Sequence, residues 1–191
     1  FALMLSPALA MARGGGACGT LHECEKAPID LHNKESLQNG AKVFISYCLG
    51  CHSAKYLRYE RMSQDLDIDP KLVEEYMMFT TDKIGDTMDT KVNHKDQAIW
   101  FGNAPPDLSL ETRFRSPDWV YSYLLNFYPD EKRPWGVNNR VFKDVAMPHV
   151  LEKFIMLKKG TLTKPIDIFD LFYHLVPTII LALKVYRDYT K

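Results

Sequence analysis

The sequence predicts a mainly α-helical fold in which a few helices are joined by long irregular loops. Two helix starts are marked by a capping residue followed by proline at the first helical position, at Asp69–Pro70 and at Ser116–Pro117. The segments between the helices are rich in Asp, Asn, Gly and Pro, and none has the alternating pattern of a half-buried strand. Loops this long are unusual around an ordinary core and are typical of a domain partly filled by a large prosthetic group.

We expect three helices in this domain. The first has Ser36 as its cap and runs into Cys48, and its inward face consists of Leu37, Val43, Phe44 and Tyr47. The second begins at Asp69–Pro70, and its apolar stripe consists of Leu72, Val73, Tyr76 and Met77. The third runs from Ser116–Pro117 to about Phe127, and its aromatic residues recur at helical spacing at Trp119, Tyr123 and Phe127.

The N-terminal region indicates export. Residues 1–12 are apolar, and the triplets 8–10 and 10–12 fit the small-x-small pattern of a signal-peptidase site. We interpret them as the remainder of a signal sequence, with an apolar N-terminal arm as the alternative. In an exported protein the pair Cys18 and Cys24 suits a small disulfide loop, and a metal site that includes His22 is a weaker alternative.

The C-terminal region resembles a membrane anchor. Residues 169–186 are mostly apolar, close to the lower limit of the roughly 17–25 residues that span a bilayer. The basic residues that follow fit a cytoplasmic flank. We therefore predict a folded domain at 13–160, and a linker with one C-terminal transmembrane helix at 161–191; a buried soluble helix is the alternative. The formal net charge of zero gives no indication of nucleic-acid binding.

The segment Cys48–His52 has the CxxCH pattern of covalent haem c attachment. Two cysteines three residues apart at a helix end lie on one face, so both thiols can form thioether bonds with the two vinyl groups of one haem. The adjacent His52 can then bind the iron. A thioredoxin-like site would need a surrounding βαβ pattern, and a zinc site would need two more Cys or His ligands at similar spacing. The sequence has neither of these features. The sequence therefore predicts a cytochrome c-like helical haem domain.

The second iron ligand must be a distant methionine or histidine. Met147 is favoured because Pro148 stiffens the backbone beside it, and His149 competes with it. The other candidates are His94, Met62, Met77, Met78, Met88 and Met156.

Several segments together resemble the proteobacterial cytochrome c1 family, the haem subunits of ubiquinol–cytochrome c reductase. They are Lys26–Leu31, Val43–Tyr56 (VFISYCLGCHSAKY), Ala104–Ser109 (APPDLS), Asp118–Leu124 (DWVYSYL) and Val145–Leu151 (VAMPHVL). The resemblance covers roughly residues 25–157 in the order of the family. The C-terminal part departs from it, because the linker after Lys158–Gly160 is shorter than in the family. Either this version is trimmed there, or residues near Gly160 are omitted.

The resemblance implies particular site residues. Met147 would be the distal iron ligand opposite His52, Arg115 would pair with a haem propionate with Arg113 as its competitor, and Pro105 and Pro106 would line the haem crevice. A propionate in a pocket needs a cationic partner, so at least one arginine is expected to serve.

The resemblance also implies electron transfer from a Rieske iron–sulfur protein through the haem to cytochrome c. The chain would sit beside cytochrome b in a bacterial inner membrane, with the haem domain periplasmic and the C-terminus cytoplasmic. It would be an electron-carrying subunit of an enzyme complex with no bond-making active site of its own. The alternatives are a haem c subunit of another respiratory complex and a free periplasmic electron shuttle. An acidic stretch at 60–89, with nine acidic and three basic residues, indicates either a docking surface for a basic cytochrome c or a solvated face.

Overall fold

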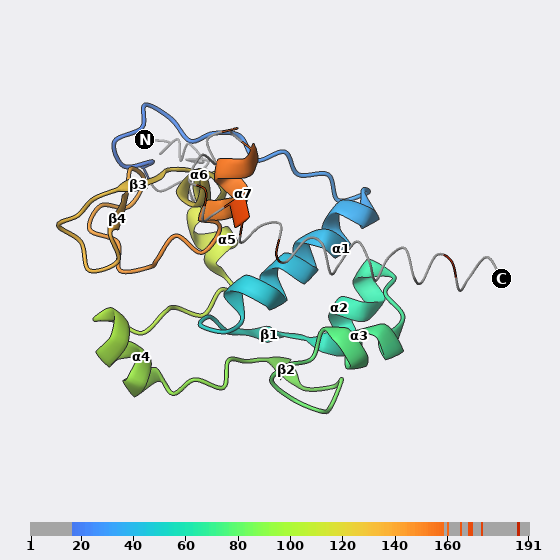
Figure 1. Cartoon of the computed structure of the whole chain (residues 1–191). Helices are drawn as coiled ribbons and strands as arrows, with labels where there is room; N and C mark the ends of the chain where they lie inside the picture. Colours follow the sequence, from blue (N-terminus) through green and yellow to red (C-terminus); the bar gives the residue numbers. More distant parts are fainter. Residues whose placement is uncertain are drawn as a thin grey trace, which may run out of the picture. The chain divides into compact units, whose positions relative to one another are not determined.

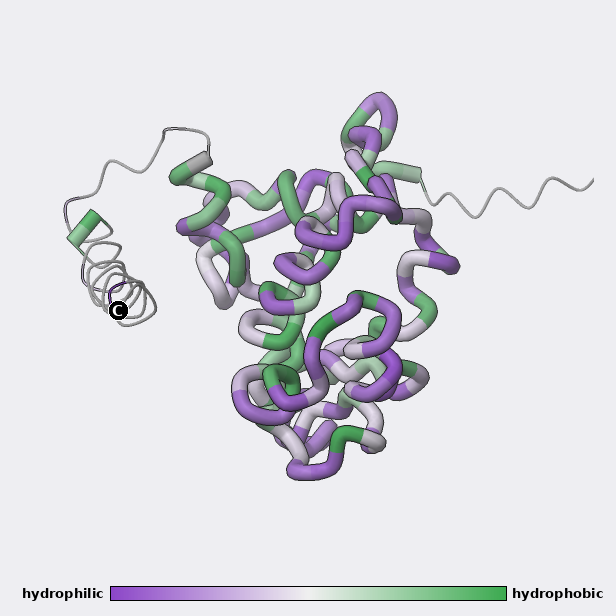
Figure 2. The backbone as a smooth tube through the Cα atoms, turned by 90° about the vertical axis from the view of Figure 1, so that its right-hand side faces the viewer, coloured by the Kyte–Doolittle hydropathy of each residue, from purple (hydrophilic) through white to green (hydrophobic). Residues whose placement is uncertain are grey.

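The computed structural model describes residues 17–158 together with residues 160, 165, 168, 169, 173 and 187 (Figure 1). It divides into two compact units, Phe1–Val150 and Leu151–Lys191. The apolar residues 1–12 and most of the predicted anchor at 169–186 lie outside the described residues. Within the described part, polar and apolar residues alternate in short stretches, and no helix combines the length and apolar character that a membrane span requires (Figure 2).

Helices and loops dominate the described residues, as predicted. The helices of the first unit are α1 (Lys34–Val43), η1 (Phe44–Cys48), α2 (Tyr59–Leu66), α3 (Pro70–Tyr76), α4 (His94–Phe101), α5 (Glu111–Arg115) and α6 (Pro117–Leu125). The second unit contains α7 (Glu152–Lys158). The strands are β1 (Ala54–Arg58), β2 (Thr87–Met88), β3 (Phe127–Pro129) and β4 (Val137–Asn139).

The strands form two small antiparallel sheets, which the sequence pattern did not reveal. β1 pairs with β2, and β3 pairs with β4 in the register Phe127 to Asn139. Segments of two to five residues are too short to display the alternation by which a strand is recognised in a sequence.

The first helix differs from its prediction at its start, whereas its expected continuation to Cys48 is confirmed. It begins at Lys34 with Asn33 as its cap, because the Asn33 side chain accepts a hydrogen bond from the backbone NH of Ser36. It continues into the π-helical turn η1, which ends at Cys48. A π turn holds more residues than an α turn and rotates the side chains that follow. Ile45 is therefore buried, whereas Tyr47, predicted to face inward, is 42% exposed.

The second predicted helix begins where expected, at Pro70 after the cap Asp69. Its apolar stripe was wrong in part, because Leu72 and Tyr76 are exposed. Val73 is fully buried and Met77 is half-buried, as predicted. A seven-residue helix has only about two turns, so few of its side chains can meet a neighbouring element. Val73 joins a core with residues of η1, α2 and the sheet: Ile45, Leu49, Ala54, Tyr59, Met62 and Met88.

The third predicted helix is α6, which begins at Pro117 with Ser116 as its cap. It ends at Leu125 and not at Phe127, because Phe127 begins β3. The predicted aromatic row is present: the rings of Trp119 and Tyr123 stack with centroids 5.3 Å apart, and Tyr123 meets Phe127 edge to face at 5.2 Å.

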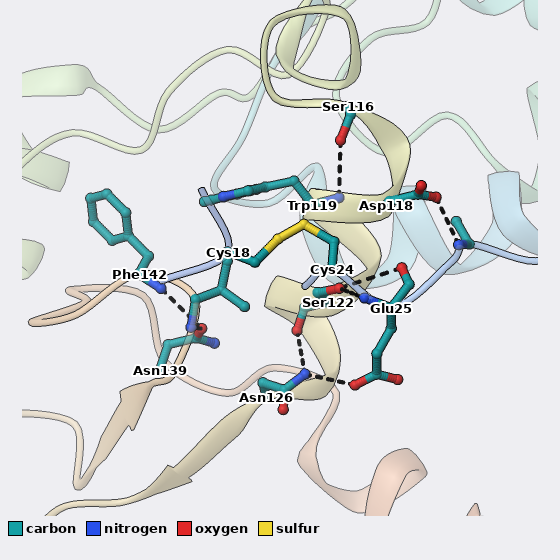
Figure 3. Close-up of a disulfide and its surroundings, with 12 residues drawn as sticks. Cys18, Cys24, Glu25, Ser116, Asp118, Trp119, Ser122, Asn126, Asn139 and Phe142 are labelled. Carbon is teal, nitrogen blue, oxygen red and sulfur yellow. Dashed lines mark hydrogen bonds between the residues drawn. A yellow bond between two sulfur atoms is a disulfide. The ribbon is translucent and has the colours of Figure 1, made fainter. Parts of the chain in front are cut away.

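Cys18 and Cys24 form the predicted disulfide, which lies against α6 (Figure 3). Cys18 packs in a second core with Trp119 and Val141. Beyond the disulfide, the backbone NH of Glu25 donates to the Ser122 hydroxyl at 2.7 Å. The N-terminal segment is thereby tied to the helix that carries Tyr123.

Candidate haem site

The Cys48–His52 motif forms a tight turn at the end of η1. The backbone NH groups of Cys51 and His52 both donate to the carbonyl of Cys48, at 3.0 and 2.8 Å. Leu49, between the cysteines, is 1% exposed and anchors the turn in the first core. Both thiols are free and half-buried. Burial, and then the nearby Cys51, raise the pKa of the Cys48 thiol, so this thiol is protonated at neutral pH.

The His52 ring is oriented by a backbone carbonyl. Its Nδ1 lies 2.8 Å from the carbonyl oxygen of Pro106. A carbonyl only accepts hydrogen bonds, so Nδ1 carries the proton and Nε2 keeps a free lone pair. This is the second-sphere arrangement that fixes the tautomer of metal-binding histidines. The residues of this turn therefore fit a covalently attached haem, with two free thiols beside an imidazole prepared to bind a metal.

The APPDLS segment runs beside the chain that follows His52 and holds it at several points. The NH of Leu108 donates to the Ser53 carbonyl at 2.7 Å. The NH of Lys55 donates to the Asp107 carboxylate at 3.0 Å. Together with the contact between Pro106 and His52, these hydrogen bonds hold the APPDLS segment against the CxxCH turn. The segment therefore braces the histidine.

A second set of contacts holds the turn from α4 and the loop before it. The side-chain amide of Gln97, which is fully buried, donates to the carbonyl of Cys51 at 2.7 Å. The hydroxyl of Thr90 donates to the carbonyl of Gly50 at 2.9 Å. The carbonyls of Gly50 and Cys51 are thus paired by side chains.

Met147 lies in a loop held against α6. Its sulfur lies 3.4 Å from the Tyr123 hydroxyl, which donates a hydrogen bond to it. Burial raises the pKa of Tyr123, so the hydroxyl is a protonated donor at neutral pH. The competing residue His149 instead stacks its ring on Phe127, with centroids 4.6 Å apart.

The other methionine and histidine candidates occupy different surroundings. Met62 and Met88 are buried in the first core, and Met77 and Met78 pack against it. His94 is the exposed first residue of α4, and Met156 belongs to α7 in the second unit.

The family model described as "Cytochrome C1 family" matches residues 24–163. The chain belongs to the cytochrome c1 family. It is 49% identical over 149 residues to cytochrome c1 of Allochromatium vinosum, covering 78% of this chain and 59% of that protein. It is also 39% identical over 176 residues to a Nitrosomonas europaea protein named ammonia monooxygenase gamma subunit, covering 85% of this chain and 73% of that protein. Covalently bound haem c is the cofactor of the cytochrome c1 family.

The two arginines that the cytochrome c1 resemblance implicates are in different situations. Arg115 pairs with Glu111 at 3.2 Å, and its guanidinium lies 4.5 Å from the centre of the Trp119 ring. Arg113, on the same short helix α5, is exposed, and within the described part of the chain its side chain makes no ion pair.

Sequence reasoning missed three side chains of this cytochrome c1 site: Gln97, Thr90 and Tyr123. Gln97 lies on a helix that the sequence analysis did not predict, and a glutamine amid Trp and Ile has no pattern that marks it as buried. The sequence pattern assigned Tyr123 to the aromatic row of a helix. Its hydrogen bond to Met147, which indicates a role at the site, is visible only in the structure.

Asp107 makes the brace on His52 dependent on pH. Burial raises the pKa of Asp107, but hydrogen bonds from Ser109 and from the backbone of Lys55 outweigh it and hold the pKa below its usual value. Because the folded pKa is depressed, the stabilisation is present above about pH 4 and is lost as pH falls through the folded pKa. Asp107→Asn should lower the free energy of unfolding at pH 7 by about 1 kcal/mol. It should also flatten the fall in stability between pH 5 and pH 2, measured by thermal unfolding of the haem-loaded protein.

The exposed Asp82 provides a control, since Asp82→Asn should leave the free energy of unfolding at pH 7 near the parent value. If Asp107→Asn kept the acid dependence of the parent, the brace would not depend on this carboxylate.

Proposed function

We propose that this chain is the haem c electron-transfer subunit of a quinol-oxidising cytochrome bc1 complex. Cys48 and Cys51 form the thioether bonds, and His52 and Met147 bind the iron. The observation that carries this proposal is the hydrogen bond from His52 Nδ1 to Pro106, which leaves Nε2 available to a metal beside two free thiols. Membership of the cytochrome c1 family supports it.

The haem, when bound, supplies a one-electron carrier, and the residues of the chain decide how it behaves. The carbonyl of Pro106 sets the tautomer of His52 and raises the basicity of the ring. A thioether ligand from Met147 favours a higher potential than a second imidazole would give. No bond of a substrate is made or broken, so the site needs no general acid, base or nucleophile.

We assign the propionate contact to the arginines of α5. Arg113 is the better candidate, because the Arg115 guanidinium already pairs with Glu111 and lies over three aromatic rings. Arg115 is the alternative implied by the family resemblance. Pro106 contributes to the crevice through its carbonyl contact with His52.

The family and the sequence support a membrane setting for this chain. We place the haem domain on the periplasmic side of a bacterial inner membrane, with a C-terminal transmembrane helix within 161–191 and a cytoplasmic C-terminus. Cytochrome b and the Rieske iron–sulfur protein are the neighbouring subunits, membrane lipid surrounds the anchor, and a soluble or tethered cytochrome c accepts the electron. Exposed acidic residues of α3, Glu74 and Glu75, steer this acceptor if it is basic.

Purification of the complex from detergent-solubilised membranes tests this function. The chain should co-purify with a b-type cytochrome and an iron–sulfur protein, and its c-type haem should be reduced when quinol is added. Electron transfer to a basic cytochrome c should slow as ionic strength rises, and salt independence would exclude the steering role. A chain that purifies alone with a haem that quinol does not reduce would overturn the proposal in favour of a free electron shuttle.

A further inference from the structure

The contact between Tyr123 and Met147 joins an α6 side chain to the loop that carries the proposed iron ligand. The Tyr123 hydroxyl donates to the Met147 sulfur over 3.4 Å. A thioether sulfur is a weak acceptor with two lone pairs, so one hydrogen bond leaves the second pair available to a metal.

The Tyr123 ring contacts both of its neighbours in the aromatic row. It stacks on Trp119 with an interplanar angle of 7° and meets Phe127 at 69°. The ring is therefore fixed by packing, and the hydroxyl is directed by the ring rather than by the hydrogen bond alone.

The backbone of the same residue is tied to the loop that leads to Met147. The Asn139 side chain donates to the Tyr123 carbonyl at 2.7 Å, and its own carbonyl oxygen accepts from the NH of Val141 at 2.8 Å. Further along, the Arg133 guanidinium donates to the carbonyl of Val145 at 3.1 Å. Tyr123 is thus anchored by the buried Asn139, and the loop before Met147 is anchored by Arg133 through Val145. Such supporting hydrogen bonds hold the two groups in one geometry.

We propose that Tyr123 is a positioning residue for Met147, whose hydroxyl holds the thioether in one orientation and reduces its electron donation to the iron. This inference rests on the proposed role of Met147 as a ligand. A sulfur that donates less electron density stabilises the oxidised iron less, so the hydrogen bond should raise the midpoint potential of the haem.

Replacing Tyr123 by phenylalanine in the haem-loaded complex isolates the hydroxyl, because the phenyl ring retains the contacts with Trp119 and Phe127. We expect Tyr123→Phe to lower the midpoint potential and to shift or weaken the sulfur-to-iron charge-transfer band of the oxidised haem. Tyr121→Phe, on the same helix, is the matched control and should leave both unchanged, because within the described residues the Tyr121 hydroxyl makes no hydrogen bond.

The outcomes separate this inference from the proposed function. If the parent protein shows the charge-transfer band but Tyr123→Phe matches it in band and potential, the role of Tyr123 is overturned and Met147 remains the ligand. If the parent shows no such band, the ligand assignment itself fails and the inference fails with it. Complete loss of the band in Tyr123→Phe alone would support positioning, since only one oxygen atom has been removed.

Discussion

Met147→Leu should lower the midpoint potential of the haem sharply and abolish quinol-driven turnover. Leucine is close to methionine in size but has no sulfur lone pair, so the iron would lose the ligand that favours its reduced state. Axial ligation sets haem potentials over a range of about 0.8 V, so we expect this to be the largest shift of any single substitution considered for this chain. The substitution also leaves the hydroxyl of the half-buried Tyr123 without its acceptor. A redox titration of the purified complex, followed at the haem absorption bands, measures the shift.

Met78→Leu is the appropriate control, because Met78 packs against the first core and should be replaced with little effect on the potential. An unchanged potential in Met147→Leu would show that another residue binds the iron. His149 would be examined first, since it lies two residues further along the same loop.

Gly19→Ala should strongly destabilise the disulfide-linked N-terminal segment. Gly19 has φ +61°, and a Cβ at this position would lie 2.2 Å from the carbonyl oxygen of Arg140 and 2.5 Å from that of Val141. The backbone at Gly19 cannot easily move away from residue 140, because the NH of Thr20 donates a hydrogen bond to the Arg140 carbonyl at 2.8 Å. The left-handed conformation costs about 1–2 kcal/mol for alanine, and the clash adds about 1–3 kcal/mol. We expect a loss of roughly 2–5 kcal/mol in the free energy of unfolding.

Gly136→Ala separates the cost of the left-handed conformation from the cost of the steric clash. Gly136 has φ +68°, and a Cβ there would meet no atom within 4 Å, so this variant should lose only about 1–2 kcal/mol. Denaturant unfolding of both haem-loaded variants, with the disulfide intact, provides the comparison. Equal stabilities would mean that the close approach of residues 140–141 does not constrain Gly19.

Much of the site was predictable because its chemistry is local in the sequence. The spacing of Cys48, Cys51 and His52 indicates haem attachment within five residues. The pair Cys18 and Cys24, six residues apart, indicates a disulfide that the structure confirms. The two Pro-marked helix starts were also confirmed, since a cap and a proline act within one turn of backbone.

Features that depend on non-local contacts were not predictable. Tyr47 was wrongly predicted to face inward because the π turn of η1 changes the rotation of the side chains, and no composition signal marks such a turn. The exposure of Leu72 and Tyr76 depends on which neighbours a short helix meets. Patterns of hydrophobicity show that a residue can be buried, and only packing decides whether it is.

The sequence by itself determined the chemistry of this protein: a haem attachment motif, a methionine and a histidine as rival distal ligands, and a family. Only the tertiary structure decided how that chemistry is held in place. Pro106 reaches His52 across 54 residues, Gln97 reaches Cys51 across 46, and Tyr123 reaches Met147 across 24. Hydrogen bonds of this kind need correct geometry in three dimensions, and residue type and spacing along the chain carry no information about that geometry.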